Sequence, residues 1–398
     1  MVSFKRYVME SVFKKQEIDL FLDPDELSWA KFDTELGYTL NNYLPRDGID
    51  NSYTISTSTN KGIRTPHNYV DKPCRINTYG NSFTQCHQVN DGETWQEYLA
   101  AHLGEPIRNY GVGGYGAYQA YRRMIRTEES PDGAENVIFY IWGDDHYRSL
   151  LRCRYITCRD WDNDGGRMLH INFWSNIEMD LESGKFSEKA NLCPTPESLY
   201  RMTDPEFMYQ SVKDDLMLQM LLFLDNAIED IDMEKLERLS DILHVQVKKD
   251  DTGVREWIVK LCDRYAFAAS EDILDKCRAF TCGKNKKLLA VIFDPYKAMR
   301  QVIRSEDRYD REIVDYLDNN GFNYFDMNLV HAKDIQCFNL SEIEYYNRYS
   351  IGHYSPAGNH FFAFSIKNRI IEMLNPKPIT YKDEKDAIID FHDYLRNY

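Results

Sequence analysis

The sequence predicts an α/β protein in which an open, doubly wound parallel sheet is interrupted by a mostly helical insertion. Two continuous apolar runs, 137–142 and 288–293, have the composition of strands that are buried on both faces. Strand-length and helix-length patterns also alternate before the first run and after the second. This alternation is typical of a parallel sheet whose strands are joined by crossover helices.

The first part of the core is expected to hold three strands and two helices. A helix is predicted where Trp95, Leu99 and Leu103 recur at intervals of four residues, and Gly104 ends it. A glycine cluster, 111–116, follows the second strand. The expected strands are 75–79, 107–110 and 137–142, and the expected helices are 94–103 and 118–126.

The pattern changes between residues 156 and 285, where helical spacing predominates. Thr203 and Glu206 have capping-box spacing with an early proline, Pro205, and open a helix whose apolar face includes Val212 and Leu224. Two more helices are expected near 233–243 and 253–280. The α/β pattern then resumes with strands at 288–293 and 322–326 and helices at 297–304, 310–318 and 361–374.

These patterns describe one interrupted domain with additions, although a length of 398 residues alone allows about two to three domains. The N-terminal segment is polar and turn-rich, with a β-prone stretch at 52–59, and is expected to cap the core. The C-terminal tail has an amphipathic pattern that suits a docked helix. The expected parts are an N-terminal cap segment (1–70), the first part of the core (71–155), a helical insertion forming a lid or pocket wall (156–285), the second part of the core (286–375) and the tail (376–398).

Composition argues against several classes of function. Lys and Arg number 48 and Asp and Glu 64, so the net charge of −16 disfavours general binding to nucleic acid or to anionic lipid. The longest apolar stretch, 216–224, is too short to span a bilayer, and the N-terminus lacks the apolar region of a secretory signal. Nine scattered cysteines match no zinc pattern and suggest reduced thiols. We therefore expect a cytoplasmic protein without nucleic-acid or membrane partners, and the sequence leaves its oligomeric state open.

Two residues have the chemistry of a nucleophile and its base. Ser82 follows the first expected strand and Gly80, so its side chain is expected at the carboxyl edge of the sheet, where helix N–H groups stabilise negative charge. His353 lies in the loop before the final helix, and a histidine pKa near neutrality suits a general base. Each has a structural alternative, because a serine in this position often caps a helix and a loop histidine often bonds backbone.

The glycine cluster supplies a third element of such a site. Gly113 and Gly114 let the backbone approach a ligand, so a free N–H there can meet an oxyanion. Gly111, Gly113 and Gly116 also fit a dinucleotide-binding fingerprint, but no acidic residue follows at the end of the next strand. A Rossmann-type, nucleotide-binding enzyme therefore remains an alternative.

A fourth group, Asp144, Asp145 and His146, directly follows the apolar run 137–142. Two carboxylates and an imidazole suggest metal ligands, but no partner set is evident elsewhere in the chain, and acidic side chains often bond loop backbone instead. No metal or other cofactor is expected. All four candidates lie at expected carboxyl ends of strands or in the loop before the last helix, where open α/β sheets bind ligands.

These blocks, in this order, resemble the SGNH/GDSL hydrolase family of esterases and lipases. Gly80-Asn81-Ser82 is similar to the family's Gly-Asp-Ser block, and 109–114 to its glycine block. The stretch 142–145 is similar to its Gly-x-Asn-Asp block, and 350–353 to its Asp-x-x-His block. The resemblance covers both parts of the core and implies a three-layer α/β/α, flavodoxin-like sheet.

The resemblance also implies a role for each block. Ser82 is the nucleophile, His353 the base, and the N–H groups of Ser82 and Gly114 hold the oxyanion. Asp144 takes the place of the oxyanion-hole Asn, where an ionised carboxylate repels developing negative charge and the missing donor is usually worth roughly 3 kcal/mol. Ser350 stands where the family has the Asp that orients the histidine.

Two possibilities therefore stay open for the orienting group. Either Ser82 and His353 act as a dyad, or a carboxylate from elsewhere replaces the missing Asp, the candidates being Asp334, Glu342 and Glu344.

The implied reaction is hydrolysis of a small ester, such as an O-acetylated sugar, through an acyl-enzyme formed on Ser82. An O-acyltransferase would use the same Ser-His pair. The departures at Asp144 and Ser350 suggest a further alternative, a catalytically degenerate SGNH-fold protein with a binding or scaffold role.

Overall fold

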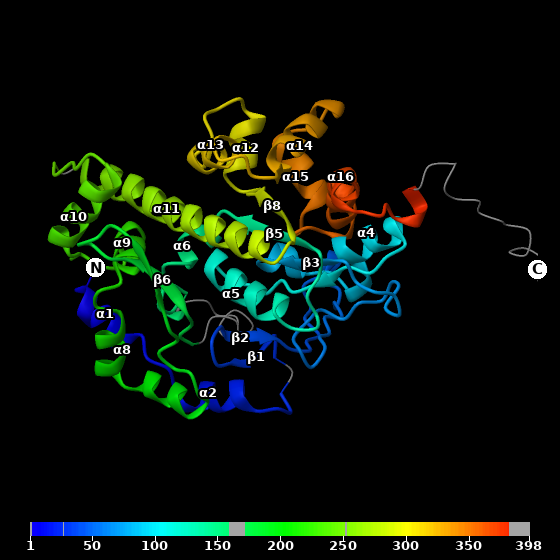
Figure 1. The fold of residues 1–398 in the computed structure, drawn as a ribbon. Coiled ribbons are helices and arrows are strands. Elements are labelled where there is room, and N and C mark those ends of the chain that lie inside the picture. The colour runs from blue at the N-terminus through cyan, green and yellow to red at the C-terminus, as the bar shows by residue number, and fades with distance from the viewer. Residues whose placement is uncertain (1, 27, 159–171, 251–252, 382–398) are drawn as a thin grey trace, which may run out of the picture.

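A computed structural model describes residues 2–26, 28–158, 172–250 and 253–381. Within these ranges the chain is a mixed α/β protein with a central five-stranded parallel sheet (Figure 1). The strands lie in the order β4-β3-β5-β8-β9. They are β3 (Ile76–Tyr79), β4 (Arg108–Asn109), β5 (Asn136–Trp142), β8 (Lys287–Phe293) and β9 (Tyr324–Asp326).

The two apolar runs form the middle of this sheet. β5 and β8 pair in parallel along their whole length, from Asn136 opposite Lys287 to Trp142 opposite Phe293. Alternate side chains of β5 enter two separate hydrophobic clusters, one on each face. Helices cover both faces: α5 (Ala117–Glu128) and α11 (Gly253–Gly283) pack on one, and α4 (Trp95–Leu103) and α16 (Pro356–Met373) on the other. The prediction of an α/β protein with a parallel sheet is confirmed.

The remaining core helices are short and surround the carboxyl edge of the sheet and the β8–β9 side. Four of them lie where no helix was predicted. α14 begins directly after β9 because the Asp326 carboxylate caps it, accepting a hydrogen bond from the Asn328 N–H at 2.9 Å. These helices are α3 (Ser82–Gln85), α6 (Asp145–Arg148), α12 (Ala298–Ile303), α13 (Arg311–Asn319), α14 (Met327–Asp334) and α15 (Glu342–Tyr349).

The insertion is helical but also carries an antiparallel hairpin. The helix expected to run from Asp204 to Leu224 is instead two helices. The Asp215 side chain starts the second one by accepting the Leu218 N–H at 2.9 Å, and it also accepts the Arg152 N–H at 3.1 Å. The elements are β6 (Asn176–Met179), β7 (Phe186–Lys189), α8 (Pro205–Val212), α9 (Leu216–Leu224), α10 (Met233–Leu243) and α11.

The N-terminal segment contains α1 (Phe4–Glu10), α2 (Lys15–Leu22) and the antiparallel pair β1 (Ala30–Asp33) and β2 (Gly37–Leu40). In Figure 1, α1 and α2 lie beside α8 and the other early helices of the insertion. The β-prone stretch 52–59 forms only isolated bridges, at Ser56 and Ser58.

The helix expected in the tail falls on residues 382–398, which lie outside the described residues. Across the described ranges, none of the helices combines the length and the apolar character needed to cross a bilayer.

Candidate active site

Ser82 lies at the carboxyl end of β3, as the first residue of α3. Asn81 caps this helix, and its Oδ1 accepts a hydrogen bond from the Phe83 N–H at 2.7 Å. The preceding Gly80 has a φ of 153°, and a Cβ built on it would lie 2.7 Å from the carbonyl oxygen of Tyr140 on β5. The turn that presents Ser82 therefore requires glycine at position 80.

His353 lies in the loop between α15 and α16, and its Nε2 is 2.8 Å from the Ser82 Oγ. The loop is fixed on both sides. Ser355 caps α16 by accepting the Gly358 N–H at 3.2 Å. The Gly352 carbonyl accepts a hydrogen bond from the Tyr346 hydroxyl at 3.2 Å. The structure thus brings together the two residues that the sequence proposed as nucleophile and base.

The side chain behind His353 is an amide. Gln88 Oε1 lies 2.9 Å from His353 Nδ1 and also accepts the backbone N–H of His353 at 2.8 Å. The Nε2 of Gln88 donates to the carbonyl oxygen of Asp47 at 3.1 Å. Gln88 follows Ser82 closely in sequence, so one short segment supplies both the nucleophile and the group that contacts the base.

The residues that the sequence offered for this orienting position lie elsewhere. None of the four has a hydrogen bond or ion pair with His353 within the described part of the chain. Their partners are the backbone of Tyr354 for Ser350, the hydroxyls of Tyr345 and Tyr349 for Asp334, Arg304 for Glu342, and the helix-capping Ser341 for Glu344. The alternative in which Asp334, Glu342 or Glu344 orients His353 therefore has no supporting contact, because each of these side chains holds its own helix or loop.

Asp144, which the resemblance places at the position of an oxyanion-hole Asn, forms an ion pair. Its Oδ2 lies 2.8 Å from Nη2 of Arg148, whose side chain is only 4 % exposed, whereas that of Asp144 is 36 % exposed. The guanidinium offsets the negative charge that would otherwise repel an oxyanion. A carboxylate still offers no N–H, so it does not replace the missing amide donor.

Backbone N–H groups remain as donors. Ser82 is the first residue of a helix, so its N–H has no intrahelical acceptor. Gly114 has a φ of 82° and lines the same cavity as Ser82 and His353. The turn is fixed at Gly113, whose N–H donates to Gln85 Oε1 at 2.6 Å.

Asp145 ties the ends of β3 and β5 together. Its buried carboxylate accepts the Trp142 N–H at 2.8 Å and the side-chain amide of Asn81. Burial raises the pKa of Asp145 to about 7, against the opposing effect of the Arg148 charge. Asn81 thus meets a carboxylate that an acidic side chain at position 81 would repel.

His146 points away from the two carboxylates beside it in sequence. Its Nδ1 lies 2.7 Å from the hydroxyl of Ser270 on α11. In the described ranges, no cluster of three or more His, Cys, Asp or Glu side chains is arranged to hold a metal ion. The metal-ligand alternative for 144–146 therefore has no supporting geometry.

Ser82 and His353 line a cavity of about 660 Å³. Its wall combines three parts of the chain. These parts are the N-terminal segment, the core and the insertion. The aromatic rings of the wall belong to Trp29, Tyr43, Trp142, Tyr147 and Tyr296, and the charged side chains to Arg46, Asp47, Asp144, Arg148, Arg154 and Asp225. Thr157, Cys158 and Leu221 of the insertion complete this part of the wall.

His353 is held neutral. Burial lowers its pKa well below the usual range, and the nearby His87 and Arg148 lower it further. The His87 ring stacks on His353 with centroids 4.8 Å apart, and its Nε2 lies 3.0 Å from Asp47 Oδ2. A neutral imidazole is the form that can accept a proton from Ser82.

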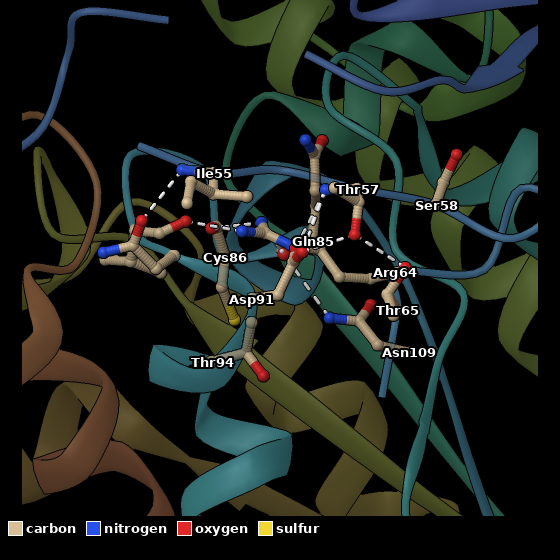
Figure 2. A network of polar contacts seen from close by, with 12 residues as sticks. Ile55, Thr57, Ser58, Arg64, Thr65, Gln85, Cys86, Asp91, Thr94 and Asn109 are labelled. Carbon is tan, nitrogen blue, oxygen red and sulfur yellow. Dashed lines mark hydrogen bonds and ion pairs between the residues drawn. The ribbon is translucent and has the colours of Figure 1, made fainter. Parts of the chain in front are cut away.

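A buried ion pair between Arg64 and Asp91 (Figure 2) fixes the segment 85–91, which carries His87 and Gln88. Arg64 lies 2.8 Å from Asp91, and the two side chains are 2 % and 5 % exposed. The same guanidinium donates to the carbonyls of Gln85 and Cys86, at 2.9 and 2.7 Å. Both ends of the segment around Gln88 are therefore anchored to one cation.

The sequence pattern did not single out Gln88, His87, Arg64, Trp29 or Asp47. The sequence contained one indirect indication of such a residue. Serine at position 350 offers no carboxylate to orient His353, so another side chain could take that role. Nothing local marks Gln88, because its role depends on a histidine that is 265 residues away in the chain.

In comparisons with known proteins, no family model and no curated protein matches the chain. Arguments about its function therefore depend on the geometry of the described residues.

Proposed function

We propose that this protein is a serine esterase of SGNH/GDSL type that hydrolyses a small ester through an acyl-enzyme. The observation that carries the proposal is the 2.8 Å separation of Ser82 Oγ and His353 Nε2 beside a cavity of about 660 Å³. This is hydrogen-bond distance for a nucleophile and its general base.

The topology supports the SGNH-type assignment. Numbered along the chain within the sheet, the strand order is 2-1-3-4-5, which is the flavodoxin-like order. In such sheets ligands bind beyond the carboxyl ends of the strands, and Ser82 follows the end of β3.

In the proposed mechanism, His353 Nε2 takes the hydroxyl proton of Ser82 while Oγ attacks the ester carbonyl. The N–H groups of Ser82 and Gly114 stabilise the tetrahedral oxyanion. The ester C–O bond breaks, the alcohol leaves with the proton from His353, and the acyl group stays on Ser82. Water, deprotonated by His353, then attacks the acyl-enzyme. The bond between the acyl carbon and Ser82 Oγ breaks, Oγ takes the proton back from His353, and the carboxylic acid is released. No cofactor takes part.

The cavity suits a small amphipathic ester such as an O-acetylated sugar. Aromatic rings offer apolar faces, and neighbouring charged groups offer hydrogen bonds to hydroxyls. The insertion residues Leu221 and Asp225 line the cavity, so we place part of the substrate selectivity there.

Covalent labelling with a fluorophosphonate probe tests the proposal. The folded protein is expected to carry one adduct on Ser82, and Ser82→Ala is expected to lose both the adduct and turnover of a short-chain nitrophenyl ester. Ser183→Ala, at an exposed serine in the β6–β7 turn, is the matched control and keeps both. No adduct on Ser82 between about pH 6 and pH 9 would refute the proposal.

Two observations favour a second candidate, a degenerate SGNH-fold binding protein: the neutral Gln88 behind His353 and the ion-paired Asp144. Ester turnover that disappears in Ser82→Ala would exclude it. An O-acyltransferase uses the same pair and is recognised by product that requires an acceptor alcohol while hydrolysis is suppressed.

A further inference from the structure

We propose that Gln88 is the positioning residue of a Ser82–His353–Gln88 triad in which a neutral amide fixes the tautomer of His353. This inference rests on the proposed esterase function and adds to it the group that prepares the base.

Two backbone groups determine which way the amide of Gln88 points. The backbone N–H of His353 can only donate, so the Gln88 atom 2.8 Å away is the oxygen. The Asp47 carbonyl can only accept, so the Gln88 atom 3.1 Å away is the NH₂ nitrogen. The orientation is thus set without reference to the imidazole.

The tautomer of His353 follows from this orientation. Gln88 Oε1 has no proton, so the contact of 2.9 Å to Nδ1 requires that Nδ1 carries the hydrogen. Nε2 then presents its lone pair to the hydroxyl of Ser82 at 2.8 Å. The Nδ1 proton stays in place throughout the reaction, and only the Ser82 proton moves to Nε2 and on to the leaving alcohol.

The surroundings leave the amide little freedom. Gly352 has a φ of 109°, and a Cβ there would lie 2.8 Å from Gln88 Oε1. Arg64 holds the carbonyls on both sides of this segment, including that of Val89. An amide also matches this position better than a carboxylate does, because the second oxygen of a glutamate would face the Asp47 carbonyl where the amide donates a hydrogen bond.

A neutral third member orients the base but does not stabilise the imidazolium by charge, unlike the carboxylate of the usual triad. The ionisable groups that face His353 are His87, stacked on it, Arg148, and Asp47 behind His87. Introducing a negative charge at position 88 is therefore expected to change how the rate depends on pH.

The test compares Gln88→Ala, Gln88→Glu and the matched control Gln210→Ala, an exposed glutamine on α8. In Gln88→Ala, kcat is expected to fall on the order of 100-fold with KM changed less than about threefold. In Gln88→Glu, the acidic limb of kcat/KM is expected to move up by about one pH unit or more, because a carboxylate raises the pKa of the imidazole. Gln210→Ala is expected to behave as the unchanged protein.

A second measurement does not depend on activity. Long-range ¹H–¹⁵N spectra of histidine-labelled protein are expected to show His353 protonated at Nδ1, and this preference is expected to be lost in Gln88→Ala. A purely structural Gln88 would lower the rate equally in both variants without moving the limb. Three outcomes would each overturn the inference. They are an equal loss of rate in both variants without a shift of the acidic limb, an unchanged kcat in folded Gln88→Ala, and a His353 that is protonated at Nε2. Failure of the esterase proposal is recognised separately, by the absence of Ser82 labelling in the unchanged protein.

Discussion

The buried Arg64–Asp91 pair is predicted to hold the loop that bears Gln88, and replacing Arg64 by methionine tests this. Methionine keeps most of the side-chain length and removes the charge. The ion pair at 2.8 Å is almost fully buried, so the change leaves the Asp91 carboxylate without its counter-ion. Breaking a buried pair from one side typically costs about 3–5 kcal/mol of the free energy of unfolding.

The assay is urea-induced unfolding of Arg64→Met, Asp91→Asn and the double variant. The double variant is expected to lose less than the sum of the two single variants, because no uncompensated charge remains. Arg304→Met is the matched control: Arg304 pairs with Glu342 at 2.7 Å, but its side chain is 50 % exposed. Solvent screens the charges of this surface pair, so its loss is expected to change the free energy of unfolding far less. The reasoning is refuted if Arg64→Met destabilises the protein no more than Arg304→Met does.

Three more predictions concern pH and the loop before α16. The acidic limb of kcat/KM is expected below about pH 6.5, because the pKa of His353 is lowered and the neutral base persists to lower pH; a limb at or above that value contradicts this. Gly352→Ala is expected to reduce kcat at least about 10-fold, because alanine is strained at a φ of 109° and its methyl group would contact Gln88. Steady-state kinetics, measured at a temperature where a thermal melt shows the variant to be folded, check this. The folded state raises the pKa of Asp145 to about 7, so it binds this proton more tightly than the unfolded chain does. The free energy of unfolding should therefore decline as the pH rises from about 4 to about 7, and Asp145→Asn should flatten that decline in urea titrations at several pH values.

The local pattern of apolar residues was sufficient to predict the two central strands of the sheet. The runs 137–142 and 288–293 coincide with β5 and β8, because a strand covered on both faces leaves few positions for polar residues. The break at Asp215 has a local signal, because an aspartate can cap a helix, but the continuous apolar face around it obscured that signal. Asp215 also accepts the Arg152 N–H from a distant part of the chain, a contact that no local pattern reveals.

In the candidate site, too, some residues were located from local pattern and others were not. The positions of Ser82 and His353 followed from the ends of predicted elements, because the carboxyl edge of a parallel sheet gathers the residues that follow its strands. Gln88, in contrast, gained its role through the N-terminal segment, whose Asp47 carbonyl fixes the amide. A contact between three loops of different origin leaves no periodic trace in the sequence.

The separation of 271 residues between Ser82 and His353 has a practical consequence. During synthesis the nucleophile leaves the ribosome long before the base does, so a growing chain cannot carry out the proposed reaction. Labelling of Ser82 would then report that the whole core, from β3 to the start of α16, has assembled. The rate at which Ser82 becomes labelled during refolding would then measure the rate at which the core assembles.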